Sequence, residues 1–192
     1  MTASNKKQKN NAQNFELNSK VNSFILEIFD EGFPLVTFYT VKKEGEDVSE
    51  TEKFVRRFYQ HEEFKEDYNQ IAYLLQLMGE EEGANDDFFT RHEDEASALP
   101  PKKVYFLDIP FHTNRLRLYC VKVCDTVVVL FNGGEKSAQT AQQSPDVQAK
   151  FRDAKRFAQK IWAEIQDQQI EVDEARHCLK SFDGKQDEII IY

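Results

Sequence analysis

Apolar and polar side chains alternate most regularly between Asn114 and Lys136, in the stretch NRLRLYCVKVCDTVVVLFNGGEK. Strict alternation is typical of a β-strand, because successive side chains point to opposite faces of a sheet. The pattern predicts two strands joined by a tight turn around Asp125. One face of the first strand is apolar apart from Lys122 and is expected to lie in the core. It carries Leu116, Leu118, Cys120 and Cys124.

Further β-prone runs lie earlier in the chain. Residues 23–29 and 33–41 are rich in β-branched and aromatic residues, and the turn signal Asp30-Glu31-Gly32 separates them. They predict either an opening hairpin or one regular strand followed by an irregular one. Residues 104–109, with the sequence VYFLDI, predict another strand just before Asn114.

Residues 49–79 have the spacing of helices. Ser49 and Glu52 form a capping box, and the apolar positions after them recur every three or four residues. They predict a helix pair that bends near residues 61–64 and ends at Gly79. Residues 80–101 are expected to form an acidic loop that ends in a Leu-Pro-Pro break.

A third helix is expected to begin at Ser144-Pro145, with serine as the cap and proline at the first helical position. Its apolar stripe consists of Phe151, Ala154, Ala158, Ile161, Trp162 and Ile165. We expect a further helical stretch up to Leu179, a turn at Asp183-Gly184, and a short closing strand in the final EIIIY.

The order of elements predicts an α+β fold. A helix pair is expected to pack on a mostly antiparallel sheet, with a C-terminal helix and an extra edge strand. Residues 1–20 are almost free of apolar side chains and are expected to be a disordered polar tail; residues 21–165 form the predicted domain, and residues 166–192 a C-terminal extension. No apolar run suits a membrane span or a signal peptide, which predicts a soluble, cytoplasmic protein.

Charge is distributed unevenly along a chain whose formal net charge is −9. Residues 44–98 contain 17 acidic and 5 basic residues, a net charge of −12. Residues 101–160 contain 11 basic and 5 acidic residues, a net charge of +6. The overall charge argues against nonspecific binding of nucleic acid by the whole surface. The contrast predicts a local basic island in an acidic protein.

Signals for metals and cofactors are weak. The chain contains no Walker loop, dinucleotide fingerprint or zinc-protease helix, so no cofactor is predicted. Its three cysteines, Cys120, Cys124 and Cys178, include no C-x-x-C pair and give no even disulfide framework. We expect reduced, buried cysteines and no metal site.

The polar face of the predicted strand carries Arg115, Arg117 and Tyr119, and Lys136 follows the next strand. Arginine forks match phosphate oxygens, and tyrosine can stack on a base or transfer a proton when nearby cations lower its pKa. RNA can be cleaved when its own 2′-hydroxyl attacks the adjacent phosphate. This reaction needs a base, an acid and positive charge around the phosphate, but it needs no metal. These four residues are therefore the candidate catalytic set.

Additional cations surround this set. The candidate RNA-binding residues are Arg91, Lys102, Lys103, His112, Arg152, Lys155 and Arg156. The last three share a helical face with Lys160, away from the apolar stripe. The competing interpretation is that all of these are ordinary surface cations and that Tyr119 lies half in the core. Asn132-Gly133-Gly134 is interpreted as a turn after the strand rather than a phosphate cradle.

At these residues the sequence resembles the RelE/HigB-like toxins, members of the RelE/ParE superfamily in bacterial type II toxin–antitoxin systems. The similarity is carried by RLRLYC, by VVVLFNGGEK and by a following helix that contains A-K-R. It is greatest to the subgroup whose strand reads L-R-L-Y-C and continues to N-G-G-x-K. The preceding helix pair, Phe88-Phe89 and Arg91 are also similar, and the resemblance covers about residues 21–165.

The resemblance implies a compact helix pair on an antiparallel sheet, and an enzyme that cleaves mRNA at the ribosome. It also implies a cognate antitoxin protein, of the helix-turn-helix kind, as the partner. On this analogy Arg115, Arg117, Tyr119 and Lys136 lie near the cleavage site.

Three functions remain open at this point. The first is a toxin with metal-independent endoribonuclease activity. The second is a non-catalytic protein-interaction module of the same fold, with the basic face as a docking site for an acidic partner. The third is a ParE-like toxin that poisons gyrase. The final EIIIY is expected either to add a strand to a sheet edge or to cover the basic face.

Overall fold

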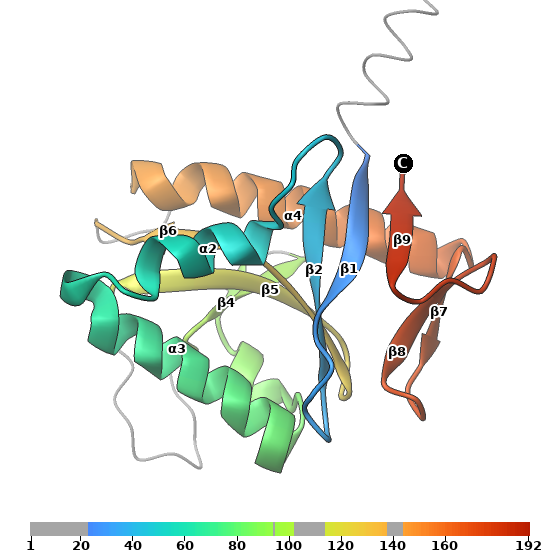
Figure 1. Cartoon of the computed structure of the whole chain (residues 1–192), viewed down its shortest axis with the longest axis horizontal. Helices are drawn as coiled ribbons and strands as arrows, with labels where there is room; N and C mark the ends of the chain where they lie inside the picture. Colours follow the sequence, from blue (N-terminus) through green and yellow to red (C-terminus); the bar gives the residue numbers. More distant parts are fainter. Residues whose placement is uncertain (1–22, 94, 102–113, 138–143) are drawn as a thin grey trace, which may run out of the picture.

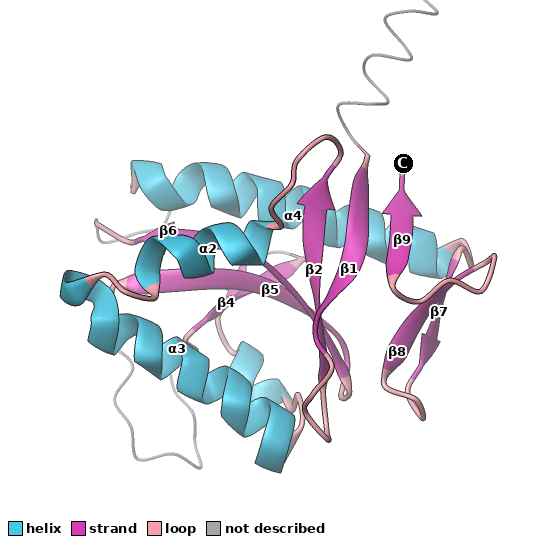
Figure 2. Cartoon of the chain, in the orientation of Figure 1, coloured by secondary structure: helices cyan, strands magenta, loops and turns pink. Residues whose placement is uncertain are grey.

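A seven-stranded sheet forms the centre of the computed structural model, which describes residues 23–93, 95–101, 114–137 and 144–192 (Figure 1). The strand order is β3-β4-β5-β6-β2-β1-β9. The strands of this sheet are β1 (Phe24–Asp30), β2 (Thr37–Lys43), β3 (His92–Glu93), β4 (Ala96–Leu99), β5 (Leu116–Cys124), β6 (Val127–Glu135) and β9 (Glu188–Ile191). Figure 2 shows helices on both faces of this sheet.

The neighbouring strands pair antiparallel with one exception, the parallel pair of β2 and β6, in which Thr37 lies opposite Val127. The parallel pair arises because the helices separate β2 from the β4-β5-β6 meander, whose last strand returns beside β2. The expected α+β class with a mostly antiparallel sheet is therefore confirmed. The opening hairpin is also confirmed, since β1 and β2 pair antiparallel with an irregularity between Ile28 and Asp30.

Two helices cover one face of the sheet (Figure 1). They are α2 (Glu50–Phe58) and α3 (Lys65–Leu77), joined by the short 3-10 helix η1 (Glu62–Phe64) at the expected bend. The Ser49 hydroxyl accepts a hydrogen bond from the backbone N–H of Glu52, so the predicted cap is confirmed. The helical path continues past Gly79 as a π turn, η2 (Met78–Glu82), and ends at Gly83, whose φ of 67° lies in the left-handed region.

The long helix α4 (Pro145–Gln166) covers the opposite face. Because successive side chains of a strand point to opposite faces of the sheet, they form two separate cores, one on each face. Leu118 and Val128 face the helix pair, whereas Tyr119 and Val129 face α4. All four are at most 1% exposed. The described part of the chain contains no helix with both the length and the apolarity needed to cross a membrane.

The segment between residues 80 and 101 is more ordered than the acidic loop expected from the sequence. It contains a short 3-10 helix, η3 (Asp86–Phe89), followed by β3 and β4. Phe88 and Phe89 are buried under the helix pair, which gives this acidic segment an apolar anchor. The strand expected at residues 104–109 lies outside the described residues.

The expectation of a helical stretch up to Leu179 is wrong. Helix α4 ends at Gln166, and the chain then forms an antiparallel hairpin of β7 (Ile170–Asp173) and β8 (Cys178–Ser181). Gln168 and His177 have φ values of 58° and 56°, and these left-handed residues turn the chain where a helix would have to continue. The Tyr39 hydroxyl accepts a hydrogen bond from the backbone N–H of Leu179 at 3.0 Å and so fixes the hairpin to the sheet.

The closing strand is confirmed. β9 pairs antiparallel with β1, with Ile190 opposite Ile25. Of the two alternatives for the final EIIIY, the added edge strand is therefore the one that the structure shows. Ile189 and Ile191 are at most 2% exposed and join the α4 core. The C-terminal segment is therefore packed as part of the sheet structure.

Candidate functional site

Arg117 and Tyr119 lie under α4, on the sheet face that this helix covers. Tyr119 is wholly buried, and its ring packs against Phe151 of α4 with 5.7 Å between centroids. Arg117 is 4% exposed, and its Nη1 donates to the backbone oxygens of Asn114 at 2.8 Å and Leu116 at 2.5 Å. The expected exposed face with three functional side chains is therefore corrected, because α4 covers the face to which two of them point.

Arg115 occupies a different environment, just before β5 and against the helix pair. Its Nη1 and Nε contact the carboxylates of Glu63 at 2.9 Å and Asp67 at 3.1 Å. Its guanidinium also lies 4.6 Å from the ring centroid of Phe64. Hydrogen bonding to Glu63 raises the pKa of Arg115 above its usual value. Its side chain remains 40% exposed, so the charge is accessible although it is paired.

Lys136 lies beside Arg115, because its backbone N–H donates to the Arg115 carbonyl at 2.7 Å. The Lys136 residue is partly exposed. We call Arg115 and Lys136 the rim pair and Arg117 and Tyr119 the covered pair. The four candidate catalytic residues thus divide into two accessible at the sheet rim and two covered by a helix.

The two glycines of Asn132-Gly133-Gly134 are required by close packing rather than by a phosphate site. A Cβ on Gly133 would lie 2.0 Å from the carbonyl oxygen of Arg117, and one on Gly134 would lie 2.4 Å from an Asp146 carboxylate oxygen. The expected turn is also corrected, since all three residues belong to β6. A side chain at either glycine would push β5 or α4 away.

Asp146, in the first turn of α4, joins three elements. Its carboxylate accepts from Arg57 of α2 at 2.8 Å, from the backbone N–H of Glu135 at 2.8 Å and from Lys150 at 3.1 Å. Burial opposes ionisation, but these donors prevail and hold the pKa of Asp146 below its usual value. Asp146 therefore fixes α4 over the covered pair.

The outer face of α4 carries exposed Arg152 and Arg156, with Lys155 and Lys160 partly exposed between and beside them. Lys155 lies 5.5 Å from the Phe151 ring centroid, and Arg156 contacts Asp153 at 3.3 Å. Desolvation, followed by repulsion from Arg156, lowers the pKa of Lys160. The expected shared helical face is thus accessible, and we call these four residues the α4 basic face.

The remaining RNA-binding candidates do not join this face in the described residues. Arg91 donates from Nε to the Pro100 carbonyl at 3.0 Å and supports the end of β4. Lys102, Lys103 and His112 lie outside the described residues.

Acidic and basic segments of the sequence contact each other in the structure. Arg115 contacts Glu63 and Asp67, and Lys122 contacts Asp86 at 2.6 Å. The charge contrast along the chain is therefore partly neutralised by folding. On the α4 basic face, Arg156 pairs with Asp153 of its own helix at 3.3 Å, and Arg152 and Arg156 remain exposed.

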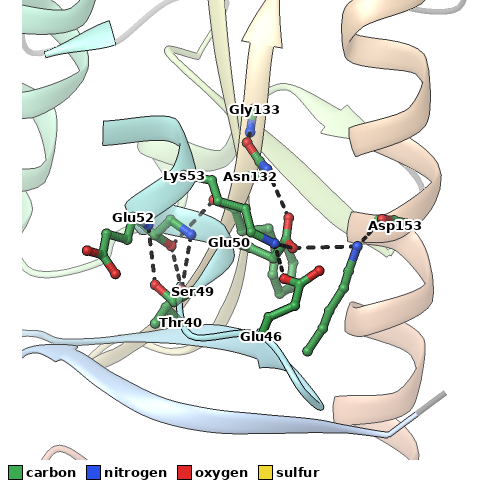
Figure 3. Close-up of polar contacts among 12 residues, drawn as sticks. Thr40, Glu46, Ser49, Glu50, Glu52, Lys53, Asn132, Gly133 and Asp153 are labelled. Atoms are coloured by element: carbon green, nitrogen blue, oxygen red, sulfur yellow. Dashed lines mark hydrogen bonds and ion pairs between the residues drawn. The ribbon is translucent and has the colours of Figure 1, made fainter. Parts of the chain in front are cut away.

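A buried polar cluster beside α2 was not expected from the sequence (Figure 3). Glu50 is 3% exposed, and its carboxylate contacts Lys53 at 2.5 Å, Lys43 at 3.5 Å and the side-chain amide of Asn132 at 2.9 Å. Asn132 in turn accepts from the backbone N–H of Gly133 at 2.8 Å. This chain of contacts connects α2 to the glycine segment of β6.

The sequence signal for this cluster was ambiguous. An acidic residue directly after a helix cap usually interacts with the positive end of the helix dipole at the surface. Thr40 and Thr51 share a buried hydrogen bond of 2.7 Å next to it, and no local pattern indicates that pairing. The burial of Glu50 follows from the contact of α2 with β6, which is distant in sequence.

Candidate metal ligands and thiols are scattered among the described residues. Among the described residues, no group of three or more His, Cys, Asp or Glu side chains could hold a metal ion. The three cysteines are free, and burial raises the pKa of the Cys120 thiol.

As an arrangement, the site can bind anions at the rim pair and along the α4 basic face. It offers no contact between RNA and the Tyr119 ring in this conformation, because that ring is wholly buried. Comparison with protein-family models, with curated proteins and with solved structures found no match for this chain.

Proposed function

We propose that this protein is a RelE-like member of the toxin–antitoxin type that acts by binding rather than by cleaving RNA. Its partner is a cognate antitoxin in the cytoplasm, and the α4 basic face docks an acidic segment of that antitoxin. The arrangement of a helix pair on a mostly antiparallel sheet supports the RelE-like part of the proposal.

The proposal rests on the burial of the covered pair. A general acid or base must reach the atom whose proton it moves, within hydrogen-bond distance or through one water. Tyr119 is 0% exposed and Arg117 is 4% exposed, both under a helix of 22 residues. Displacement of α4 would expose Ala154, Ala158 and Ile161, all of which are wholly buried. Its apolar contacts therefore oppose opening of the site.

The α4 basic face supports the docking part. Arg152 and Arg156 are exposed on an element that is itself held by Asp146 and by the core. A rigid basic surface fits a carboxylate-rich segment, since arginine forks pair with carboxylates in two-point contacts. Desolvation is the main cause that lowers the pKa of Lys160, and repulsion from Arg156 adds to it, so these two cations lie close enough to interact.

Titration with a fluorescent oligoglutamate peptide tests this docking. We expect the double variant Arg152→Glu/Arg156→Glu to weaken binding about 10-fold or more, since each lost charged contact is worth about 1 kcal/mol. The matched control is Arg176→Glu/Lys185→Glu, which makes the same charge change at exposed positions near the C-terminal hairpin. Equal weakening by both double variants would contradict a specific role for the α4 basic face.

The rim pair favours a second candidate, the metal-independent endoribonuclease acting on mRNA at the ribosome. Arg115 and Lys136 are adjacent and partly exposed, so they can place two cations near a phosphate. In this candidate Lys136 moves the proton and Arg115 stabilises the phosphorane charge.

Expression in a bacterial host without the partner separates the two candidates. Binding alone predicts unchanged growth and unchanged message levels. Nuclease action predicts growth arrest and message loss, which Lys136→Ala abolishes and Lys150→Ala, a change at another partly exposed lysine, does not.

A further inference from the structure

The strand β9 has only one partner strand. It lies at one end of the seven-stranded order and pairs with β1, as Figure 1 shows for the red and blue strands. Within the described residues, its outer edge pairs with no strand. The backbone groups that point outward from an edge strand are open to pairing with another chain.

β9 lacks proline, lysine and a bulge, three features that often protect an edge strand. Natural edges are shortened, bent by bulges, or carry proline or lysine. β3, the strand at the other end of the sheet, is two residues long. β9 is four residues long, reads Glu-Ile-Ile-Ile, and pairs with β1 in continuous register. The two edges of the sheet are therefore not equivalent.

Exposed apolar side chains gather beside β9. Six large apolar or aromatic side chains are exposed in the described residues, and three of them are Phe182 at 85%, Ile190 at 50% and Tyr192 at 78%. All three line a groove of about 290 Å³ between β9, the open end of the β7–β8 hairpin and the end of α4. A clustered apolar surface at an unpaired edge is typical of an interaction site.

We propose that the outer edge of β9 pairs antiparallel with β9 of a second copy of this chain, which extends the sheet across a twofold axis. This inference is independent of the proposed function. The segment from Glu188 to Tyr192 is self-complementary when Ile190 lies opposite its own copy. Glu188 then lies opposite Tyr192, so the two carboxylates do not face each other, and Ile189 lies opposite Ile191 on the core face.

The charge of the chain sets how this association depends on salt. Each copy has a formal net charge of −9, and the groove itself contains Glu164, Asp183 and Glu188 against Lys185. Like charges repel, so apolar contact and backbone hydrogen bonds drive the pairing. Because salt shortens the range of repulsion, with a Debye length of about 10 Å at 0.1 M, the dimer strengthens as salt is added. Association driven by opposite charges would weaken instead.

Disulfide trapping tests the register. Directly opposite Cα atoms in an antiparallel pair lie about 5 Å apart, which suits a disulfide. In a Cys124→Ser background, we expect Ile190→Cys to form a covalent dimer under mild oxidation. The control Glu188→Cys is expected to remain monomeric, because its two copies lie about 13 Å apart in this register. Crosslinking of Glu188→Cys without crosslinking of Ile190→Cys would overturn the proposal.

Light scattering across a concentration series tests the association itself. Ile190→Lys is expected to raise the dimer dissociation constant at least about 10-fold, since it places two like charges opposite each other at the axis. Tyr73→Lys is the matched control on α3, where the replaced side chain is 42% exposed, and should dimerise like the native chain. Unchanged unfolding temperatures show that both variants are folded. A native chain that stays monomeric at every concentration and salt level, or an Ile190→Lys variant that dimerises normally, would overturn the proposal.

Discussion

The covered pair and the rim pair differ in access although they come from one short motif. Arg117 and Tyr119 are at most 4% exposed beneath α4, whereas the Arg115 side chain is 40% exposed beside the helix pair. Arg117 donates to carbonyls of its own chain segment, and Arg115 contacts two carboxylates from the acidic segment. Residues two positions apart in sequence therefore have different physical roles.

One short stretch of sequence therefore supplies side chains for packing as well as charged side chains at the surface. Tyr119 fills the core under α4, and Gly133 allows β6 to approach the Arg117 carbonyl. Both residues contribute to the stability of the fold through packing. The rim pair contributes charge at the surface, where partners can reach it. The four predictions below perturb these two regions in order of expected effect.

Replacement of Tyr119 by alanine should have the largest effect. The ring is wholly buried between the sheet and Phe151. Removing a buried aromatic ring leaves a cavity and costs about 3–5 kcal/mol. Urea unfolding measures this loss. The control Tyr59→Ala removes a ring that is 58% exposed and should cost much less. Equal costs would show that Tyr119 is not packed as described.

Gly133→Ala should be next. The added Cβ would lie 2.0 Å from the Arg117 carbonyl oxygen and 2.8 Å from the Phe54 ring. The backbone of β5 must shift to make room, at a cost of about 1–3 kcal/mol for an overpacked core. Gly32→Ala is the control, because its nearest contact is a side-chain oxygen at 3.2 Å. Chemical denaturation measures the free energy of unfolding of both variants. Equal values would contradict the close packing of β5 against β6.

At the rim, Arg115→Ala should destabilise by about 1–2 kcal/mol, because it removes hydrogen bonds to Glu63 and Asp67 that are partly exposed. The loss should shrink in high salt, since screening already weakens these pairs. Arg176→Ala, at a side chain that is 72% exposed, should change stability by less than about 0.5 kcal/mol. A salt-independent loss would mean that stacking on Phe64, rather than charge, holds Arg115.

The smallest effect should be the pH-dependent contribution of Asp146 to the free energy of unfolding, about 1 kcal/mol or less. Its folded-state pKa is lowered by Arg57, Glu135 and Lys150 against the opposing effect of burial. The stabilisation is therefore complete above the unfolded pKa of about 3.9 and is lost as pH falls through the lower folded-state pKa. Asp146→Asn should be less stable than the native chain at pH 7, and this difference in stability should disappear as the pH falls through the lowered folded-state pKa of Asp146. A difference in stability between the two proteins that stays constant as the pH falls would contradict this role of the Asp146 carboxylate.

Local signals in the sequence predicted much of the fold. The Ser49 cap, the apolar stripe of α4 and the alternation in β5 depend on neighbours within one helical turn or one strand, so they can be recognised in isolation. The closing strand could be recognised for the same reason. The hairpin of β7 and β8 could not, because Gln168 and His177 adopt left-handed backbone conformations that their side chains do not indicate.

The candidate site was less predictable. Alternation assigns Arg117 and Tyr119 to one face of a strand but does not say what covers that face. The cover is α4, which begins 26 residues after Tyr119, at Pro145. Glu50 was missed for the same reason, because its partner Asn132 lies on a strand 82 residues away in sequence. Contacts between distant segments decide which polar residues are accessible.

Helix α4 covers the Arg117–Tyr119 face, and our proposal that the protein binds without cleaving RNA rests on this cover. The most direct measurement is the half-life of a reporter message in a translating bacterial extract, with purified native protein and with Tyr119→Phe. Tyr119→Phe keeps the buried ring and removes only the hydroxyl group. The account predicts that neither protein shortens the half-life of the message. Cleavage of the message by the native protein would contradict it. Loss of that cleavage in Tyr119→Phe would assign it to the covered hydroxyl group, and its retention would assign it to the rim pair.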